Sequence, residues 1–327
     1  MGKTLEKPAA AGVLPSRSRF FVYTGLGFTI FNWGAAFVAA RFLLHPDSVG
    51  LVALSPLLLA AVRICIASLF FVGPLVRALV KRQLTPRDLL LMFLLGQLAF
   101  SLYFWMQYTG VQQTNASIAS ILVIGLIPTF TALLAPAFGK ERLALSLFAA
   151  LLLGFVGIAL MALQQPFVVS LQSGFLLGAL CLLGNAFNFS LYSHLSKRYL
   201  RVMSPVVLTG GMMISGALGL ILLTLLDPAH NRWQDIIQLD GIQWAALLFL
   251  AVICSVLSYF AYNVALSKLA ASRVTVYLYF EPVVAVLLGV TLLGERLTWQ
   301  MVLGTLAIAG SVVLVNWLKR ERRADRA

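Results

Sequence analysis

The sequence has little charge: Asp, Glu, Lys and Arg together make up 11% of its 327 residues, against 61% hydrophobic residues. Soluble domains carry roughly 25% charged residues, so the composition excludes an ordinary soluble fold. Cysteine is also scarce, and Cys65, Cys181 and Cys254 all fall within apolar runs. They have neither the number nor the spacing of a disulfide framework or a zinc site, and we expect them to be small buried side chains.

Motifs for nucleotide hydrolysis and for metal or nucleophilic catalysis are also missing. No Gly-x-x-x-x-Gly-Lys-Ser/Thr loop occurs, which excludes ATP hydrolysis by a phosphate-binding loop of that kind. The three histidines, His45, His194 and His230, lack metal-ligand spacing, and no Ser/His/Asp arrangement is indicated. We therefore predict no metal, no cofactor and no enzymatic activity.

Long apolar runs are what the sequence does contain. A membrane-spanning helix needs about 20 mainly apolar residues, and this criterion gives ten candidates. The candidate spans are residues 20–40, 51–75, 89–108, 116–138, 143–163, 174–194, 205–226, 242–266, 275–293 and 298–318. The first run is longer than the roughly 7–15 residues of a signal-peptide core, so we expect it to be retained. The predicted fold class is an all-α membrane protein with ten transmembrane helices.

The basic residues separate to one side of these ten spans. The net charge is +13, and most of the 24 Lys and Arg residues fall in the two tails or in the loops after even-numbered spans. Arg41, Arg232 and Arg296 fall on the opposite side. The positive-inside rule predicts an inner-membrane protein with both termini in the cytoplasm. Short basic clusters between apolar runs also argue against nucleic-acid binding.

The sequence repeats itself at about half its length. Residues 128–143 and 282–297 each begin with proline and end, after twelve intervening residues, with Glu-Arg-Leu. The same shift of 154 places Tyr108 on Tyr262. Two repeats of five spans each must insert with opposite orientations, because five is an odd number, and sites in such proteins lie between the repeats. The predicted organisation is a tail at 1–19, a first repeat at 20–163, a second repeat at 174–318 and a basic tail at 319–327.

Three motifs carry a resemblance to a known family. They are Ser55-Pro56 followed by Arg63, Pro128 followed by Gly-Lys-Glu-Arg-Leu at 139–143, and Glu281-Pro282 followed by Gly-Glu-Arg-Leu at 294–297. At these spacings the chain resembles the EamA-type members of the drug/metabolite transporter superfamily, over residues 20 to 318. The resemblance implies two inverted five-helix repeats around a central substrate cavity and transport of small metabolites, commonly export of amino acids or toxic compounds. The aromatic amino-acid exporter is one such relative, and no motif specific to it is present.

Two formal charges fall deep within predicted spans, Arg63 and Glu281. Ionisable groups inside a membrane are costly and often functional, so Glu281 is a candidate proton carrier. The alternative, that each group bonds to neighbouring backbone or side chains as part of the fold, is favoured for both. The first repeat has Ile127 in the position of Glu281, so a proton role would belong to one repeat only.

Pro128 and Pro282 occupy matching places in the two repeats. Proline removes a backbone hydrogen bond and kinks a helix, and paired kinks suit a rocking movement of one bundle against another. We predict hinges at these residues, with a static bend as the equal alternative.

Polar and aromatic residues recur at helical spacing on one face of five predicted spans. Amide and phenol groups with aromatic walls could hold the polar ends and the apolar side chain of a small zwitterion. For a single tyrosine, packing or a headgroup position is the simpler interpretation. The candidate substrate residues are Asn32, Trp33, Tyr103, Gln107, Asn185, Asn188, Tyr192, Tyr259, Asn263 and Tyr277.

These patterns together predict a secondary carrier for small organic molecules, with amino-acid export as the leading hypothesis. The driving force would be the substrate gradient or a counter-moving proton. An importer or multidrug exporter of the same architecture stays open, because direction cannot be read from a symmetric repeat. A membrane enzyme, a lipid-handling protein and a non-transporting scaffold are the alternatives from other classes. The oligomeric state is not predicted, since glycine-rich helix faces pack within or between subunits.

Overall fold

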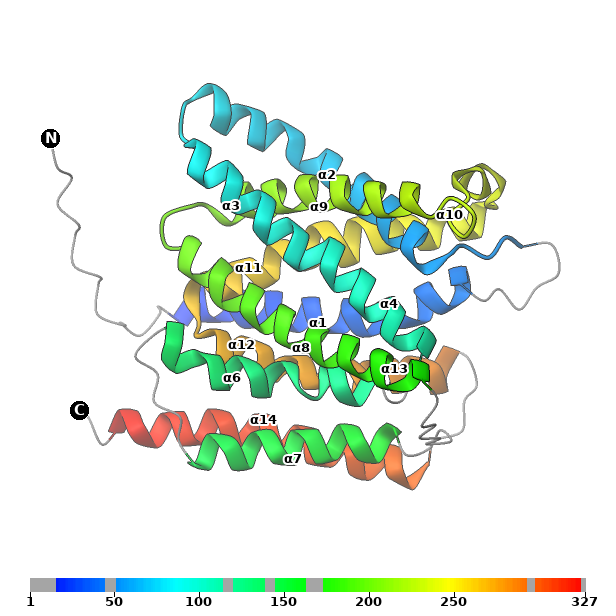
Figure 1. Ribbon diagram of the computed structural model, residues 1–327. Helices are drawn as coiled ribbons and strands as arrows, with labels where there is room; N and C mark the ends of the chain where they lie inside the picture. Colours follow the sequence, from blue (N-terminus) through cyan, green and yellow to red (C-terminus); the bar gives the residue numbers. More distant parts are fainter. Residues whose placement is uncertain are drawn as a thin grey trace, which may run out of the picture.

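A computed structural model describes residues 16–44, 51–113, 120–138, 145–162, 173–292 and 298–324 of the chain. All regular structure in these segments is helical (Figure 1). The Glu-Arg-Leu phrases at 141–143 and 295–297 lie outside them, so their interpretation as matching loops stays a prediction.

The helices follow one another in chain order, with several spans built from consecutive helical pieces. They are α1 (Ser16–Leu44), α2 (Pro56–Val80), α3 (Pro86–Gly96), the π-helix η1 (Gln97–Leu102), α4 (Tyr103–Gln113), the π-helix η2 (Ser120–Ile124), α6 (Ile127–Phe138), α7 (Leu145–Ala162), α8 (Ser173–Tyr199), α9 (Pro205–Leu226), the 3₁₀ helix η3 (Trp233–Gln238), α10 (Gly241–Leu248), the π-helix η4 (Phe249–Leu257), α11 (Ser258–Lys268), α12 (Ala271–Val276), the 3₁₀ helix η5 (Tyr277–Tyr279), α13 (Phe280–Leu292) and α14 (Trp299–Ala324).

Six of the described helical runs are long and apolar enough to cross a membrane. These runs are Arg19–Leu44, Pro56–Val80, Pro86–Val111, Gly174–Tyr199, Pro205–Leu226 and Gly241–Lys268. Ile127–Phe138, Phe148–Leu160 and Trp299–Leu314 are shorter apolar helices. Large apolar side chains such as Leu69 and Leu180 are more than half exposed, which a lipid environment explains. The all-α membrane class agrees with the prediction, whereas the count of ten spans stays a prediction.

Capping residues set where the helices begin. The second span was predicted from residue 51, but α2 begins at Pro56 because the Ser55 hydroxyl accepts a hydrogen bond from the Leu58 amide at 3.2 Å. Proline at the first helical position needs no amide hydrogen. At the start of α3, Thr85 and Asp88 form a reciprocal capping box, which ends the short turn after α2.

The helices pack in pairs across the two halves of the chain. In Figure 1, α7 lies along α14 at one edge and α2 crosses α9 at the other. Close backbone approach holds the first pair together: a Cβ on Gly157 would lie 2.7 Å from the Gly304 carbonyl oxygen, and the Ser311 hydroxyl donates to the Ala150 carbonyl at 2.6 Å. Between these outer pairs, α1 packs on α11 and α13, while α8 packs on α4 and α6.

Two π-helical segments interrupt long helices at the centre of the bundle. The segment η1 lies between α3 and α4, and η4 lies between α10 and α11. A π turn disturbs the regular backbone ladder, and such turns often occur at functional sites. Side chains of neighbouring helices donate hydrogen bonds to carbonyls of both segments: Asn188 to Leu98 in η1, and Trp33 to Cys254 in η4.

The start of α1 and the end of α14 lie at the same end of the bundle (Figure 1). The turn between α2 and α3 lies at that end too, whereas α10 lies at the opposite end. We call these the α1-start end and the α10 end.

Candidate functional site

An aromatic cluster fills the centre of the bundle between α1, η1, α8 and α11. We define the central cluster as Trp33, Phe100, Phe189, Tyr192, Tyr259 and Tyr262. Trp33 is its hub: its ring centroid lies 5.0 Å from that of Tyr259 and 5.3 Å from that of Tyr262. The Tyr259 ring also lies 4.9 Å from Phe100, and Phe189 lies 5.4 Å from Tyr192. Rings at such separations attract one another, so four helical pieces share one aromatic wall.

Hydrogen bonds fix the phenols at one side of this cluster. Tyr192 donates to the Asn263 amide oxygen at 3.3 Å, and the Asn263 amide nitrogen donates to the Thr209 hydroxyl at 2.9 Å. The hydroxyls of Tyr262 and Ser193 lie 2.9 Å apart. All five residues are buried. Tyr192 and Asn263 are therefore brought together as predicted members of one site, and both have protein partners.

The two asparagines of α8 each keep one buried atom without a partner. The Asn185 amide nitrogen donates to the Tyr103 carbonyl at 2.6 Å, and that of Asn188 donates to the Leu98 carbonyl at 2.7 Å. Their Oδ1 atoms are buried and accept no hydrogen bond within the protein. An unsatisfied buried acceptor costs about 1–3 kcal/mol, so these oxygens are suited to receive a donor from a bound molecule.

Two residues of opposite formal charge lie on apolar helices, Arg63 on α2 and Glu281 on α13. The Arg63 guanidinium donates from Nε to the Ser255 hydroxyl at 2.7 Å. Glu281, in the first turn of α13, is 8% exposed. Its backbone lies against α1, since a Cβ on Gly34 would lie 2.9 Å from the Glu281 carbonyl oxygen. Both formal charges predicted inside the membrane therefore border residues next to Trp33: Glu281 lies against Gly34, and Ser255, the partner of Arg63, follows Cys254.

The remaining predicted substrate residues lie around this centre with less involvement in it. Asn32 donates to the Phe28 carbonyl of its own helix at 2.8 Å. Gln107 is half-buried on α4, one turn beyond Tyr103. The Tyr277 ring lies 6.0 Å from that of Tyr23 on α1, one turn before Glu281. The structure thus groups Trp33, Tyr103, Asn185, Asn188, Tyr192, Tyr259 and Asn263 more closely than Asn32, Gln107 and Tyr277.

The two candidate hinge prolines lie at breaks between helical pieces. Pro128 is the second residue of α6, after η2 and a two-residue turn, and Pro282 is the third residue of α13, after η5. The first turn of a helix tolerates proline because its amides have no intrahelical acceptor. Side chains of α8 bond to the carbonyls beside the first break: Ser190 donates to the Ile127 carbonyl at 2.9 Å, and the His194 ring nitrogen lies 2.7 Å from the Thr131 carbonyl.

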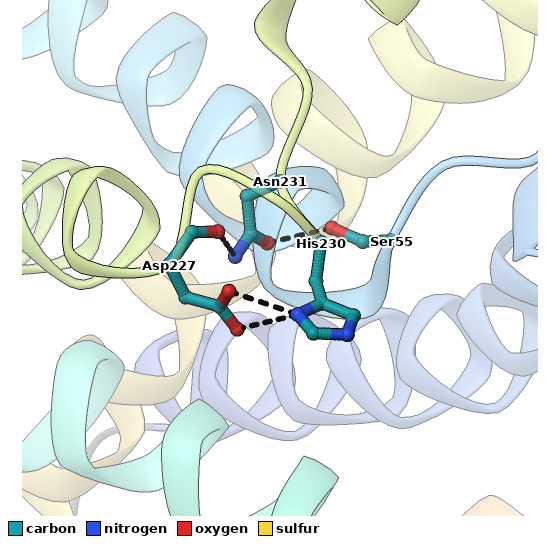
Figure 2. A network of polar contacts seen from close by, with 4 residues as sticks. All are labelled: Ser55, Asp227, His230 and Asn231. Atoms are coloured by element: carbon teal, nitrogen blue, oxygen red, sulfur yellow. Dashed lines mark hydrogen bonds and ion pairs between the residues drawn. The ribbon is translucent and has the colours of Figure 1, made fainter.

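At the α10 end, a polar network joins the α9–α10 connection to the start of α2 (Figure 2). The Ser55 hydroxyl donates to the Asn231 amide oxygen at 2.7 Å, and the Asn231 amide nitrogen donates to the Asp227 carbonyl at 2.8 Å. The exposed His230 ring lies 2.8 Å from the Asp227 carboxylate, whose hydrogen bond and charge raise the pKa of His230 above its ordinary value. This network explains Ser55 as both helix cap and loop anchor.

Several members of the site were missed by the sequence reasoning. Tyr262, Phe100 and Phe189 belong to the central cluster, and Thr209 and Ser255 hold Asn263 and Arg63. Tyr262 had a signal, because it is the counterpart of Tyr108 under the 154-residue shift. Phenylalanine and serine in apolar runs have no such signal, since most of them pack against neighbours or bond to their own helix.

The described residues include no group of three or more His, Cys, Asp or Glu side chains that could hold a metal ion. Cys181 and Cys254 are buried, Cys65 is half-buried, and all three are free thiols. The site offers charged, amide and phenol groups within aromatic walls, which suits binding of a small polar or zwitterionic molecule.

Long apolar helices with large exposed apolar side chains define a multi-pass membrane protein. The chain belongs to the EamA-like transporter family, whose family model matches residues 21–163 and 176–317. It is accordingly a membrane transporter, and the resemblance inferred from its motifs is confirmed.

Relatives across bacteria and archaea are named as transporters. The chain is 27% identical over 292 residues to an uncharacterized transporter of Archaeoglobus fulgidus, covering 89% of this chain and 97% of the relative. It is 28% identical over 300 residues to a probable terminal-alkyne amino-acid exporter of Streptantibioticus cattleyicolor, covering 91% and 94%. The uncharacterized inner membrane transporter YedA of Escherichia coli is 27% identical over 290 residues, covering 87% of each chain.

Solved structures share the fold, among them one crystal structure of a protein. It superposes with a TM-score of 0.75, covering 94% of this chain and 98% of the other, at 18% sequence identity. At that identity the likeness concerns the fold alone.

Proposed function

We propose that this protein is a secondary transporter that exports amino acids across the cytoplasmic membrane by alternating access. The observation that carries the proposal is that both formal charges border residues next to Trp33. Arg63 bonds to Ser255, which follows the Cys254 that accepts the Trp33 indole hydrogen, and Glu281 lies against Gly34, which follows Trp33. An amino acid has a carboxylate and an ammonium group, and charge-assisted bonds to a guanidinium and a carboxylate suit these two ends. Arg63 would receive the substrate carboxylate, and Glu281 would receive the ammonium group.

The uncharged groups of the site support the same substrate class. The partner-free oxygens of Asn185 and Asn188 are further acceptors for ammonium hydrogens. The central cluster provides an apolar aromatic wall for the substrate side chain. Trp33 donates its indole hydrogen to the Cys254 carbonyl at 2.9 Å, so its ring is held in place and its faces are the part offered to a ligand.

The amino-acid class and the outward direction have support from one relative. The Streptantibioticus cattleyicolor protein is named a probable terminal-alkyne amino-acid exporter, and it matches nearly all of this chain. An excess of positive charge at the α1-start end supports a cytoplasmic location for both termini. Export then means that substrate enters from the α1-start end and leaves at the α10 end.

We also propose the architecture of ten spans in two inverted five-helix repeats, at residues 20–163 and 174–318. Helix packing supports it, because exchanging each predicted span for its counterpart preserves the contacts. The pairs α2–α9 and α7–α14 each join counterparts, and the contacts of α1 with α11 and α13 become those of α8 with α4 and α6. The start of α1 and the end of α14 at one end of the bundle agree with an even number of spans.

Two positional coincidences add to this support. The Tyr279 hydroxyl donates to the Gly125 carbonyl at 3.3 Å, and these residues are 154 apart. Counterparts in a two-fold arrangement touch each other only near its axis. Adding the same 154 to the π-helix η1, Gln97–Leu102, gives residues 251–256, which lie within the π-helix η4, Phe249–Leu257.

Movement would occur at the breaks before Pro128 and Pro282. Each break separates a short helical piece from a longer one, so one piece can tilt with few backbone bonds lost. Rocking of one repeat against the other about these points would expose the central cluster first at one end and then at the other. Glu281 adjoins the second break, which suits a carboxyl that exchanges its proton as the site turns.

Counterflow in proteoliposomes tests the proposal. Purified protein in liposomes preloaded with an unlabelled amino acid should accumulate the same amino acid in labelled form, across a panel that also includes nucleosides and cationic dyes. Ile237→Ala is a matched control, since that side chain is 85% exposed outside the site. If no member of the panel enters faster than into empty liposomes, the carrier function is wrong. If only dyes enter, amino-acid selectivity is wrong.

A separate measurement tests proton coupling. Glu281→Gln should abolish accumulation driven by a pH gradient. It should retain counterflow once the substrate concentration is raised to offset its weaker binding of the ammonium group, because exchange needs no net proton movement. Unchanged pH-driven accumulation in this variant would eliminate Glu281 as the proton carrier.

Labelling from the two sides tests the spans. In a cysteine-free background, Arg232→Cys should react with an impermeant thiol reagent from outside intact cells, and Lys81→Cys only after the membrane is opened. Reaction of both from the same side would contradict the proposed topology.

A further inference from the structure

A groove on the outside of the bundle lies between α2, α3 and α9, away from the central cluster. Its volume is about 180 Å³, and its lining is almost wholly apolar. The lining residues are Leu75, Leu89, Met92, Phe93, Gly211, Ile214, Ser215 and Leu218. Leu89, Phe93 and Leu218 are each more than 40% exposed, so the groove opens sideways, in the direction of lipid.

Small residues on α9 form the floor of this groove. A Cβ on Gly211 would lie 2.2 Å from the Met92 sulfur, so α3 rests directly on the backbone of α9. The Ser215 hydroxyl lies 3.0 Å from the Met92 carbonyl and 3.3 Å from that of Phe93. The one polar lining side chain is therefore satisfied within the protein, and the groove presents an apolar surface to an occupant.

At the α1-start end, the groove reaches the basic turn between α2 and α3. The lining residues nearest this turn are Leu75, two residues before Arg77, and Leu89, two residues after Arg87. Each therefore lies about 3 Å along its helix from an arginine. At 1.5 Å per residue, Gly211 and Leu218 lie about 9 Å and 20 Å beyond the start of α9 at Pro205. The groove thus covers about the depth of one leaflet, whose hydrocarbon is roughly 15 Å thick.

The basic residues of this turn form no ion pairs among the described residues. Arg77, Lys81, Arg82 and Arg87 are exposed, and none of them forms an ion pair among the described residues. The nearby Asp88 is engaged in its helix cap, since its Oδ2 accepts bonds from the amide and hydroxyl of Thr85 at 2.8 and 2.7 Å. The four basic residues outnumber this one carboxylate, so an anion placed on the turn would meet a surface of net positive charge.

We propose that this groove and turn form a binding site for an anionic phospholipid of the adjacent leaflet. One acyl chain would lie in the groove over Gly211 and Ser215, and the phosphate would lie among Lys81, Arg82 and Arg87. A zwitterionic phospholipid fits the groove equally well, but its net neutral headgroup gains less from the turn. The site therefore selects by charge at the headgroup and by shape along the chain.

The attraction between the basic residues and the lipid headgroup sets how strongly the site should prefer an anionic to a zwitterionic phospholipid. Each basic residue near an anionic lipid surface strengthens binding about five-fold, so removing two should weaken binding on the order of ten-fold or more. Zwitterionic lipid should change little. Filling the groove should instead weaken both lipids, because the acyl-chain contact is common to them.

Native mass spectrometry of the detergent-solubilised full chain, titrated with phosphatidylglycerol or phosphatidylcholine, tests the site. The wild type should bind phosphatidylglycerol at least ten-fold more tightly. Lys81→Gln with Arg87→Gln should reduce that preference to about two-fold or less, whereas the matched double variant Arg198→Gln with Lys268→Gln, which removes two exposed charges elsewhere, should keep it.

A second pair of variants separates the groove from simple surface attraction. Ile214→Trp fills the half-buried groove wall and should weaken both lipids. Leu222→Trp, one turn beyond the last lining residue of α9, should not. Leu89→Trp at the exposed rim provides the same test if Ile214→Trp fails to fold, as judged by thermal unfolding. Absence of a headgroup preference overturns the site, and so does a preference that survives filling of the groove, which would show attraction of a basic turn alone.

Discussion

The assignment of Arg63 and Glu281 to opposite ends of an amino acid leads to a substrate-by-variant test. Arg63→Gln removes the charge and retains an amide that can still reach Ser255, and Glu281→Gln removes the other charge at constant shape. Hydrogen bonds to charged groups contribute about 1.5–3 kcal/mol, and every 1.4 kcal/mol is about ten-fold in affinity. Each variant should therefore weaken amino-acid binding about 10- to 100-fold.

The discriminating measurement uses analogues that lack one end. Competition against counterflow would compare an amino acid with its methyl ester, which has no carboxylate, and with the corresponding acid that lacks the amino group. Arg63→Gln should weaken the amino acid and the des-amino acid and leave the ester unchanged. Glu281→Gln should weaken the amino acid and the ester and leave the des-amino acid unchanged.

If the Arg63→Gln substitution only distorts the site, it should weaken all three competitors alike. If Arg63→Gln weakens the ester by the same factor as the amino acid, Arg63 supports the fold and does not bind the carboxylate. Ser255→Ala is the control for positioning, because it removes the partner of the guanidinium at 2.7 Å and retains the charge. It should weaken binding less than Arg63→Gln does, with the same dependence on the carboxylate.

Two further predictions concern contacts outside the charged pair. In Gly34→Ala, the new Cβ would lie 2.6 Å from the Val284 Cβ, and such overpacking costs about 1–3 kcal/mol. The variant should therefore unfold at a lower temperature than the wild type in detergent. Gly27→Ala is the control, because a Cβ there meets nothing within 4 Å, and it should unfold no earlier than the wild type. The pKa of His230 should lie above its ordinary value of 6.5 and return to it in Asp227→Asn, as measured by NMR of labelled histidine. Because the pKa is raised in the folded state, the stabilisation from this pair is present below pH about 6.5 and is lost as the pH rises through the raised pKa of His230.

Much of the scaffold could be predicted from the sequence because lipid imposes simple rules. Apolar runs of about 20 residues identify helices, and the runs at 20–40 and 205–226 fall within α1 and α9. The run predicted at 275–293 is less regular: it contains parts of α12, η5 and α13. Composition does not report such a break, because a 3₁₀ turn and an α turn need the same apolar side chains.

The site could be predicted only in part. Asn263 and Tyr192 stood out because amides and phenols are rare in apolar runs, and they do bond to each other. The sequence could not show that Thr209 satisfies the amide nitrogen of Asn263, nor that Asn185 keeps one oxygen without a partner. Those facts depend on how α8, α9 and α11 pack, and helix rotation is set by contacts across the whole bundle.

The π-helical segments have a consequence for the assembly of the chain in the membrane. Asn188 of α8 supplies a donor to the Leu98 carbonyl in η1, while Trp33 of α1 donates to the Cys254 carbonyl in η4. The ribosome delivers the earlier partner long before the later one. Leu98 must therefore wait in lipid or in the insertion machinery until α8 arrives, and Trp33 must wait until η4 arrives. Neither half of the chain can complete its interior by itself, so a truncated product should keep unsatisfied polar groups in the membrane and be a ready target for quality-control proteolysis.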